Sequence, residues 1–158
     1  MKKWLPLFFV LFFSLSGSAQ SGANPDRIVG YYLAVDPKTG AQSQVEIYRG
    51  ADNKYYGKIV WLQHPYENGR PIVDSKNPDK ELRDRPMLGL PLLSGFVYNP
   101  KKDEWDNGSL YNPASGDTYH CYMKFVAENK LKIHGYIGSA WMGLGKNAFW
   151  PKENALRK

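Results

Sequence analysis

The segment Gly108–Gly138 reads GSLYNPASGDTYHCYMKFVAENKLKIHGYIG, and it decides the fold. Apolar and polar residues alternate in two of its runs, Tyr119–Phe125 and Leu131–Ile137. A period of two is typical of β-strands that turn one face to a hydrophobic core. Since only a short polar stretch separates the runs, we expect two consecutive antiparallel strands.

The register of this strand pair follows from the requirement that both apolar sets face the core. Directly opposed residues of an antiparallel pair lie on the same face. A two-residue loop at Glu128–Asn129 would place Phe125 opposite Lys132, whereas a three-residue loop centred on Glu128 avoids this mismatch. We therefore predict the following pairs: Val126 with Lys130, Phe125 with Leu131, Met123 with Ile133, Tyr122 with His134, Cys121 with Gly135, and His120 with Tyr136.

This register places the single cysteine on the core-facing side of the strand pair and two histidines on the opposite side. The chain contains one cysteine, so an intramolecular disulfide is excluded, and we expect a buried, inert Cys121 thiol. His120 and His134 become diagonal neighbours beside tyrosines, without the close spacing of a structural zinc site. We therefore predict packed imidazoles on a half-exposed face, with no metal and no cofactor.

The rest of the chain continues the pattern of short strands and Pro- or Gly-containing turns. We expect a single all-β domain, an antiparallel barrel of about eight strands. The segment Gln63–Pro91 has no periodicity and is predicted to form one long irregular loop. Within this loop, residues 77–86 resemble a short helix capped by Asn77 and stopped by Pro86. The further strands are expected at Ile28–Val35, Gln44–Tyr48, Lys54–Leu62, Leu92–Tyr98 and Gly108–Tyr111.

The N-terminus has the pattern of a secretory signal. Lys2 and Lys3 precede the apolar run Trp4–Phe13, and small residues follow it up to Ala19. We expect residues 1–19 to be removed and residues 20–158 to form a soluble bacterial protein in the periplasm or outside the cell, without a membrane span. The formal net charge of +6 includes the two signal lysines, and its basic clusters are interleaved with acids. This pattern indicates a solvated surface and no nucleic-acid partner.

The long loop holds most of the candidate polar groups. Asp74, Asn77 and Asp79 could supply oxygen ligands to calcium, but their spacing does not match an EF-hand, and an Asx-turn with a helix cap explains them more simply. Arg83 and Arg85 could bind a carboxylate or a phosphate. They could equally lock the loop through salt bridges with neighbouring aspartates, and we favour that structural role.

An ordered set of motifs across residues 20–158 resembles a family of small exported bacterial proteins, the domain of unknown function 2147. The resemblance implies no activity, because none is established for the family. The motifs that carry it are Ile28-Val29-Gly30, Tyr56–Leu62, Asp74, Asn77-Pro78-Asp79, Leu82–Pro86, Gly89-Leu90, Gly108, Tyr111-Asn112-Pro113, Gly116, Tyr119, Leu131, Gly135–Gly138 and Trp150.

A looser resemblance links the chain to the lipocalin-like barrels. In those proteins a Gly-x-Trp motif on the first strand closes one end of the barrel against an arginine. Here Gly30-Tyr31-Tyr32 has a tyrosine at that position, and Lys152, beside Trp150, stands where the basic residue is expected. The resemblance implies a lipocalin-like barrel closed at one end.

Export, strand pattern and abundant aromatic residues together favour a monomeric, non-catalytic binding protein for a small apolar or envelope-derived ligand. Tyr32 and Trp61 are its aromatic candidates, and Asp74, Asn77, Arg83 and Arg85 are its polar ones. Two alternatives stay open. One is an envelope module that holds a protein or glycan through exposed tyrosines and the long loop. The other is an enzyme that works with the Asp74–Arg85 loop, which we disfavour because only clustered polar residues point to it.

Overall fold

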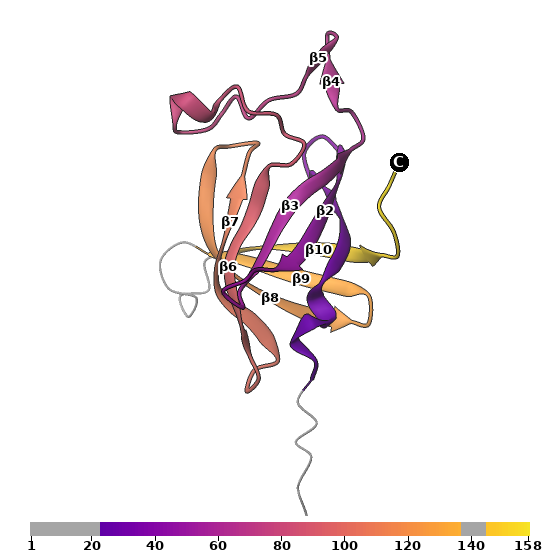
Figure 1. Ribbon diagram of the computed structural model, residues 1–158, viewed down its shortest axis with the longest axis vertical. Coiled ribbons are helices and arrows are strands. Elements are labelled where there is room, and N and C mark those ends of the chain that lie inside the picture. Colours follow the sequence, from indigo (N-terminus) through magenta and orange to yellow (C-terminus); the bar gives the residue numbers. More distant parts are fainter. Residues whose placement is uncertain (1–22, 137–144) are drawn as a thin grey trace, which may run out of the picture.

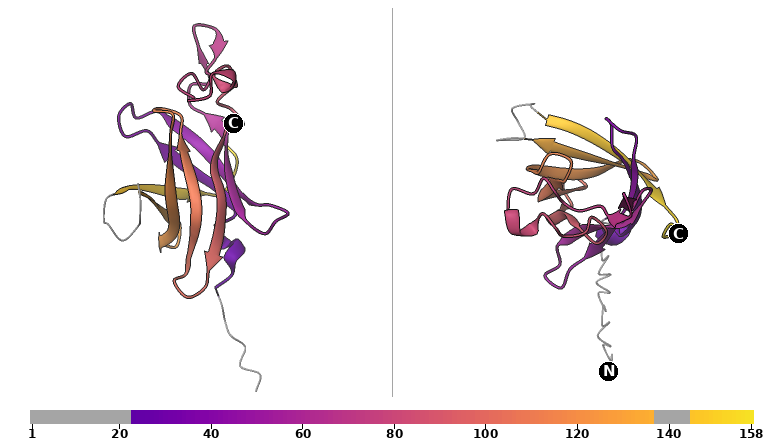
Figure 2. Two further views of the ribbon diagram at one scale, coloured as in Figure 1. Left: turned by 90° about the vertical axis from the view of Figure 1, so that its left-hand side faces the viewer. Right: turned by 90° about the horizontal axis from the view of Figure 1, so that it is seen from above.

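In the computed structural model, which describes residues 23–136 and 145–158, eight strands close into one antiparallel barrel. Its order is β1-β10-β9-β8-β7-β6-β3-β2, and Figures 1 and 2 show the strands surrounding a single core. The predicted all-β barrel is therefore confirmed. The barrel strands are β1 (Gly30–Val35), β2 (Gln42–Arg49), β3 (Tyr55–Leu62), β6 (Pro91–Asn99), β7 (Glu104–Asn112), β8 (Asp117–Ala127), β9 (Lys130–Tyr136) and β10 (Gly145–Glu153).

The strand bounds differ from the predicted ones where the alternation is broken. Strand β7 begins at Glu104, four residues before its predicted start. The prediction missed these residues because an irregularity at Asp106-Asn107 interrupts the alternation of apolar and polar side chains. Asn107 has a positive φ of 59° there. At the other end of the chain, Ile28 belongs to the 3₁₀-helix η1 (Pro25–Ile28) and not to the first strand.

The hairpin of β8 and β9 has the predicted register and a different turn. Phe125 pairs with Leu131, Met123 with Ile133, and Tyr122 with His134, as expected. The predicted pairing of Val126 with Lys130 is wrong, since Ala127 pairs with Lys130 and the register shifts between Phe125 and Ala127. The bulge at Val126 gives the chain a two-residue turn while keeping the apolar faces matched.

The helix η1 and a set of inward-facing aromatic residues close one end of the barrel. Tyr55, Phe96 and Trp105 are at most 2% exposed. Two carboxylates tie η1 to the strands: Asp26 accepts from Tyr55 and Arg49, and Asp103 accepts from Tyr98 and Arg27. This end of the barrel is therefore filled by side chains.

The long loop stands at the opposite end of the barrel, above the strands in Figure 1. It contains a small hairpin of β4 (Tyr66–Glu67) and β5 (Arg70–Pro71), and the 3₁₀-helix η2 (Lys80–Leu82). The predicted helix is thus shorter, and its N-cap is Asp79 and not Asn77. The amide of Asp79 donates to Asn77 Oδ1, which gives the expected Asx-turn.

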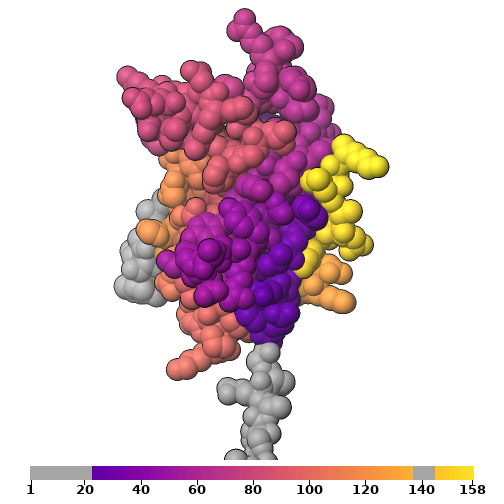
Figure 3. Space-filling view, viewed as in Figure 1, coloured from indigo at the N-terminus to yellow at the C-terminus, as the bar shows by residue number. Residues whose placement is uncertain are grey.

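The C-terminal residues 154–158 run outside the barrel across β1 and β2, and Figure 3 shows them in yellow against indigo β1. Gln44 is fully buried, and both the nitrogen and the oxygen of its side-chain amide form hydrogen bonds with residues 153–157. Its Nε2 donates to Glu153 and to the carbonyl of Ala155, and its Oε1 accepts from the amide of Arg157. Together with Glu153, this tail links the end of β10 to β2, which lies on the other side of β1.

Among the described residues, no helix has the length and apolarity that a membrane crossing requires.

Candidate functional site

The polar candidates of the long loop converge on Asp74, which is 1% exposed. Its Oδ1 accepts from the Tyr111 hydroxyl at 2.7 Å, and its Oδ2 accepts from Asn77 Nδ2 at 2.7 Å. Arg85 donates to the same Oδ2 from Nε at 3.1 Å and from Nη2 at 2.9 Å. The predicted cluster therefore exists, and its members bind one another.

These contacts set the charge state of the cluster. Burial opposes ionisation of Asp74, but the hydrogen bonds from Tyr111, Asn77 and Arg85 outweigh it and hold its pKa below the usual value. Burial, followed by the bond to Asp74, raises the pKa of Tyr111. The result is an ionised carboxylate with a full set of partners.

Arg83 adds a further bond inside the loop, since its Nε donates to the carbonyl of Asn77 at 2.7 Å. Lys76 fastens the loop to the turn between β7 and β8 by donating to the carbonyl of Ala114. The four candidates Asp74, Asn77, Arg83 and Arg85 thus serve the internal structure of the loop, which favours the locking role.

Tyr32 and Lys152 meet at the closed end, as the resemblance to lipocalin-like barrels implies. Tyr32 is fully buried, and its hydroxyl donates to the carbonyl of Ile28 at 2.7 Å. The ammonium of Lys152 lies 5.8 Å from the Tyr32 ring centroid and donates to the carbonyl of Arg27. Tyrosine and lysine thus occupy the two closing positions, and Tyr32 seals the barrel end.

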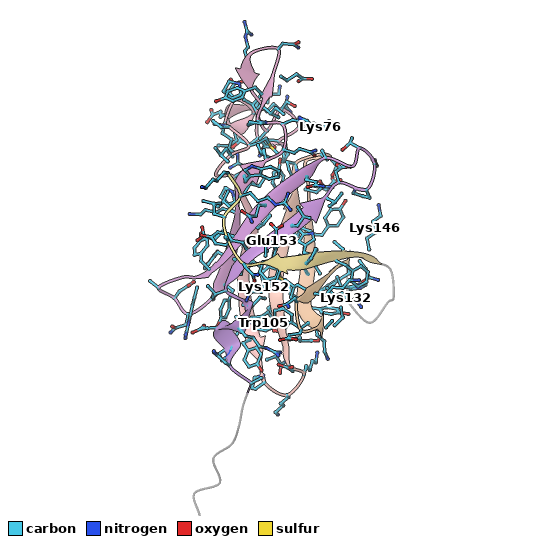
Figure 4. The ribbon with its side chains drawn as sticks, turned by 90° about the vertical axis from the view of Figure 1, so that its right-hand side faces the viewer. Lys76, Trp105, Lys132, Lys146, Lys152 and Glu153 are labelled. Atoms are coloured by element: carbon cyan, nitrogen blue, oxygen red, sulfur yellow. The ribbon has the colours of Figure 1, made fainter. Side chains whose placement is uncertain are left out.

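An arginine–tryptophan pair is also present at this end, formed by residues that sequence reasoning did not select. The guanidinium of Arg27 lies 5.4 Å from the Trp105 ring centroid and 5.2 Å from that of Phe125. Figure 4 shows Trp105 and Lys152 close to the end where η1 lies. Arg27, just before the first strand, was a signal in the sequence that could have pointed to this pair. Its partner could not be found, because Trp105 lay outside every predicted strand.

Trp61 lies outside the barrel and does not join the interior candidates. It pairs with Gln44, whose side chain faces the C-terminal tail. Its indole Nε1 donates to the carbonyl of Lys158 at 3.1 Å, and Arg157 lies 5.1 Å from its ring centroid. The bulge between Gln44 and Val45 shifts the alternation of this strand pair.

The interior differs between the two ends of the barrel. Toward η1 most inward side chains are large and buried, such as Tyr55, Phe96 and Trp105, although Tyr98 and Phe125 are only partly buried. Cys121, at the level of Gly135, is fully buried, and burial raises its thiol pKa to about 12. The expected buried cysteine is therefore confirmed. Toward the long loop, the residues that the strand register turns inward are only half-buried, and most are small or apolar: Ala34, Ser43, Leu62, Leu110, Tyr119, Gly135 and Ala148.

Comparisons with known proteins agree with this architecture. Residues 30–152 match the family described as "Uncharacterized protein conserved in bacteria (DUF2147)". A solved structure described as "Protein HP1028 from the human pathogen Helicobacter pylori belongs to the lipocalin family" is similar, with a TM-score of 0.68 and 22% identity over 80% of this chain and 82% of that chain. At this identity the likeness concerns the fold. No functionally curated protein matches the chain.

Proposed function

Since the chain belongs to the bacterial family DUF2147, whose function is unknown, and folds as a lipocalin-like barrel, we propose that it is an exported protein that binds one small apolar ligand. The observation that carries the proposal is the contrast between the two barrel ends. Side chains fill the end at η1, whereas inward-facing residues such as Ala34, Leu110 and Ala148 stay half-exposed at the other end. A barrel of eight strands is wide enough to hold one small ligand.

The chemistry of the half-exposed inward residues supports an apolar ligand. Leu62, Leu110 and Ala148 offer only carbon atoms, and Tyr119 adds an aromatic ring beside Gly135. Charged side chains follow only at the rim of this end, where the register continues the inward face to the exposed Asp117 and Lys146. Pockets lined by apolar side chains with few polar groups are typical of small-molecule sites. Tyr32 and the Trp105 pair form the floor below this site.

A neutral fluorophore, N-phenyl-1-naphthylamine, tests the proposal. Wild-type protein is expected to bind it with a blue-shifted emission, whereas Ala34→Trp, on the inner face, fills the site and weakens binding at least about tenfold. Val35→Trp is the matched control, because Val35 is the next residue of β1, faces outward and is 50% exposed. Binding that survives Ala34→Trp unchanged, or that Val35→Trp weakens equally, would contradict an interior site.

The export part of the proposal rests on the N-terminal pattern of lysines, an apolar run and small residues. When the full chain is produced in a bacterial host, we expect the protein in the periplasm or the medium, beginning at Gln20. N-terminal sequencing of the fractionated protein checks this. Recovery of the uncleaved chain from the cytoplasm would contradict it.

The envelope-module alternative has one specific observation in its favour. The long loop exposes Tyr66 at 65% and Leu88 at 54%, so it displays apolar side chains to solvent. A Tyr66→Ser/Leu88→Ser double variant separates the two functions. It should leave fluorophore binding unchanged, and it should abolish co-purification of an envelope partner only if the loop holds one.

A further inference from the structure

The outer surface of β8 and β9 carries a continuous ladder of tyrosine and histidine rings. His120 pairs across the strands with Tyr136, and Tyr122 pairs with His134. The ring centroids are 6.1 Å apart in the first pair, 5.0 Å apart in the second, and 6.3 Å apart between His134 and Tyr136. These four rings and the two lysines Lys124 and Lys132 are here called the ladder face.

The rings of the ladder turn their faces toward one another. The interplanar angles are 30° for His120–Tyr136, 35° for Tyr122–His134 and 27° for His134–Tyr136. Asn147 of β10 also holds the His134 ring, with 2.7 Å between Nδ1 and the Asn147 Oδ1. His134 is therefore held in place, and the hydroxyl and imidazole edges of the four rings are the parts left for a ligand.

Lysines lie beside the ladder at the end near the hairpin turn. Lys132 Nζ is 5.8 Å from the Tyr122 ring centroid, and Lys124, directly opposite Lys132, donates to the carbonyl of Lys102. On the neighbouring strand, Phe149 is 49% exposed, with Lys130 Nζ 5.2 Å from its centroid. Figure 4 shows Lys132 on this side of the molecule.

Acidic side chains are missing from this part of the surface. The outward positions of β8 from His120 to Lys124, and those of β9 from Lys130 to Tyr136, carry no carboxylate. The carboxylates next to Lys124 belong to β7 and the turn before it: Asp103 bonds to Arg27 and Tyr98, Glu104 pairs with Lys102, and Asp106 accepts from the amides of Asn99 and Asn107. Lys124 thus has Asp103 in its neighbourhood, whereas Lys132 and Lys130 on β9 have no carboxylate on their own strand or on the facing part of β8, and they give this surface its positive charge.

We propose that the ladder face binds an anionic sugar chain, one that carries carboxylate or phosphate groups along a hydroxyl-rich backbone. Tyrosine hydroxyls and imidazole nitrogens can both donate to and accept from sugar hydroxyls. Lys124 and Lys132 bind the anionic groups through charge-assisted hydrogen bonds. This site lies on the outside of the barrel and is independent of the interior ligand site.

The orientation of the rings favours a sugar chain over single-stranded nucleic acid. Proteins that bind single strands stack the bases on free aromatic faces. In the ladder the faces of His120, Tyr122, His134 and Tyr136 are turned to each other. His134 and Tyr136 each face two neighbouring rings, and Lys132 lies over Tyr122, so His120 alone of the four keeps an outer face for a base. A hydroxyl-rich chain needs only the exposed ring edges.

The test uses protein spanning residues 20–158 and three probes of similar length: hexagalacturonate, neutral isomaltohexaose and the oligonucleotide dT6. Titrations at low salt, followed by amide NMR shifts and calorimetry, are expected to show hexagalacturonate binding on β8 and β9 that weakens as salt is added. The variant Lys124→Ser/Lys132→Ser should bind about tenfold more weakly. Lys38→Ser/Lys80→Ser loses the same charge from exposed positions elsewhere and should bind as wild type.

Each other outcome overturns the proposal. An equal loss in the two double variants would trace binding to net charge, and equal binding of isomaltohexaose would remove the role of the anionic groups. Tighter binding of dT6 would assign the surface to nucleic acid. Shifts confined to the barrel interior, or no binding of hexagalacturonate at millimolar concentration, would leave the ladder face without this function. Amide spectra of the variants establish that they are folded.

Discussion

At the scale of single residues, the sequence identified the right groups more readily than their roles. Asp74, Asn77 and Arg85 were selected because they cluster in an irregular segment, and the structure brings them within hydrogen-bonding distance. What the sequence could not show is Tyr111, 37 positions away, whose hydroxyl completes the set. Tyr32 with Lys152 could be predicted from the motif resemblance, but Trp61 could not, because a bulge decides which way it faces.

Asp74→Asn is expected to destabilise the protein by about 3 kcal/mol, because it leaves Arg85 and Tyr111 without their buried anion. In wild type the lowered pKa means that the stabilisation by ionised Asp74 is present above the usual value of 3.8 and is lost as pH falls through the lower folded value. The variant should lack this acid-dependent loss. Urea unfolding between pH 2 and pH 7 measures both effects.

Asp84→Asn is the control for this prediction, since Asp84 is an exposed neighbour in the same loop. Its free energy of unfolding should stay within about 0.5 kcal/mol of wild type. An Asp74→Asn protein as stable as the control at neutral pH would mean that the cluster does not hold the loop.

At the scale of elements, alternation was enough to find the strands, and matching the apolar faces was enough to find the register of β8 with β9. Turn chemistry was the weak point. A bulge at Val126 reconciles a two-residue turn with the predicted pairing of Phe125 and Leu131, and nothing in the local pattern announces it. The small hairpin β4–β5 was missed because it is short and exposed, so that no burial pattern marks it.

The docking of the long loop on the turn between β7 and β8 leads to a prediction at this scale. Gly116 has φ +80°, and a Cβ there would lie 2.1 Å from the carbonyl oxygen of Lys76. Gly116→Ala should cost about 2 kcal/mol or more and should speed amide exchange at Asp74 and Asn77, because the loop must move away.

Gly69→Ala provides the comparison, since Gly69 also has a positive φ, +74°, but a Cβ there meets no atom within 4 Å. It should cost only the backbone strain of about 1 kcal/mol and leave exchange at Asp74 unchanged. If the two variants exchange alike, the contact with Lys76 does not hold the loop in place.

At the scale of the whole molecule, the barrel and its closed end could be predicted from strand count and motif resemblance. The contrast between a filled and a half-open end could not be predicted, because the amino-acid composition gives the number of aromatic residues and not their positions in the barrel. Seven inward-facing positions far apart in the chain meet at the open end only once the register of all eight strands is known. The closure between first and last strands also depends on a tail that has no strand pattern.

Ending the chain at Asn154 should loosen this closure, because Gln44 loses its bonds to Ala155 and Arg157. We expect amides of Tyr31 and Tyr32 to exchange at least about tenfold faster while those of β8 and β9 keep their protection. Leu156→Ser, a change at a residue that is 50% exposed, is the control and should leave exchange unchanged. Uniformly faster exchange over all strands would indicate general destabilisation instead.

The junction between β1 and β10 is also the part of the barrel that we expect to be mechanically weakest. Only two residue pairs join these strands, against seven between β10 and β9. The start of β1 and the end of β10 lie at the same end of this antiparallel pair, at Tyr31 and Glu153, so tension on these two strands would break their hydrogen bonds one after another once the tail has left Gln44 and Trp61. The barrel would therefore open first between β1 and β10, while β10 stays paired with β9.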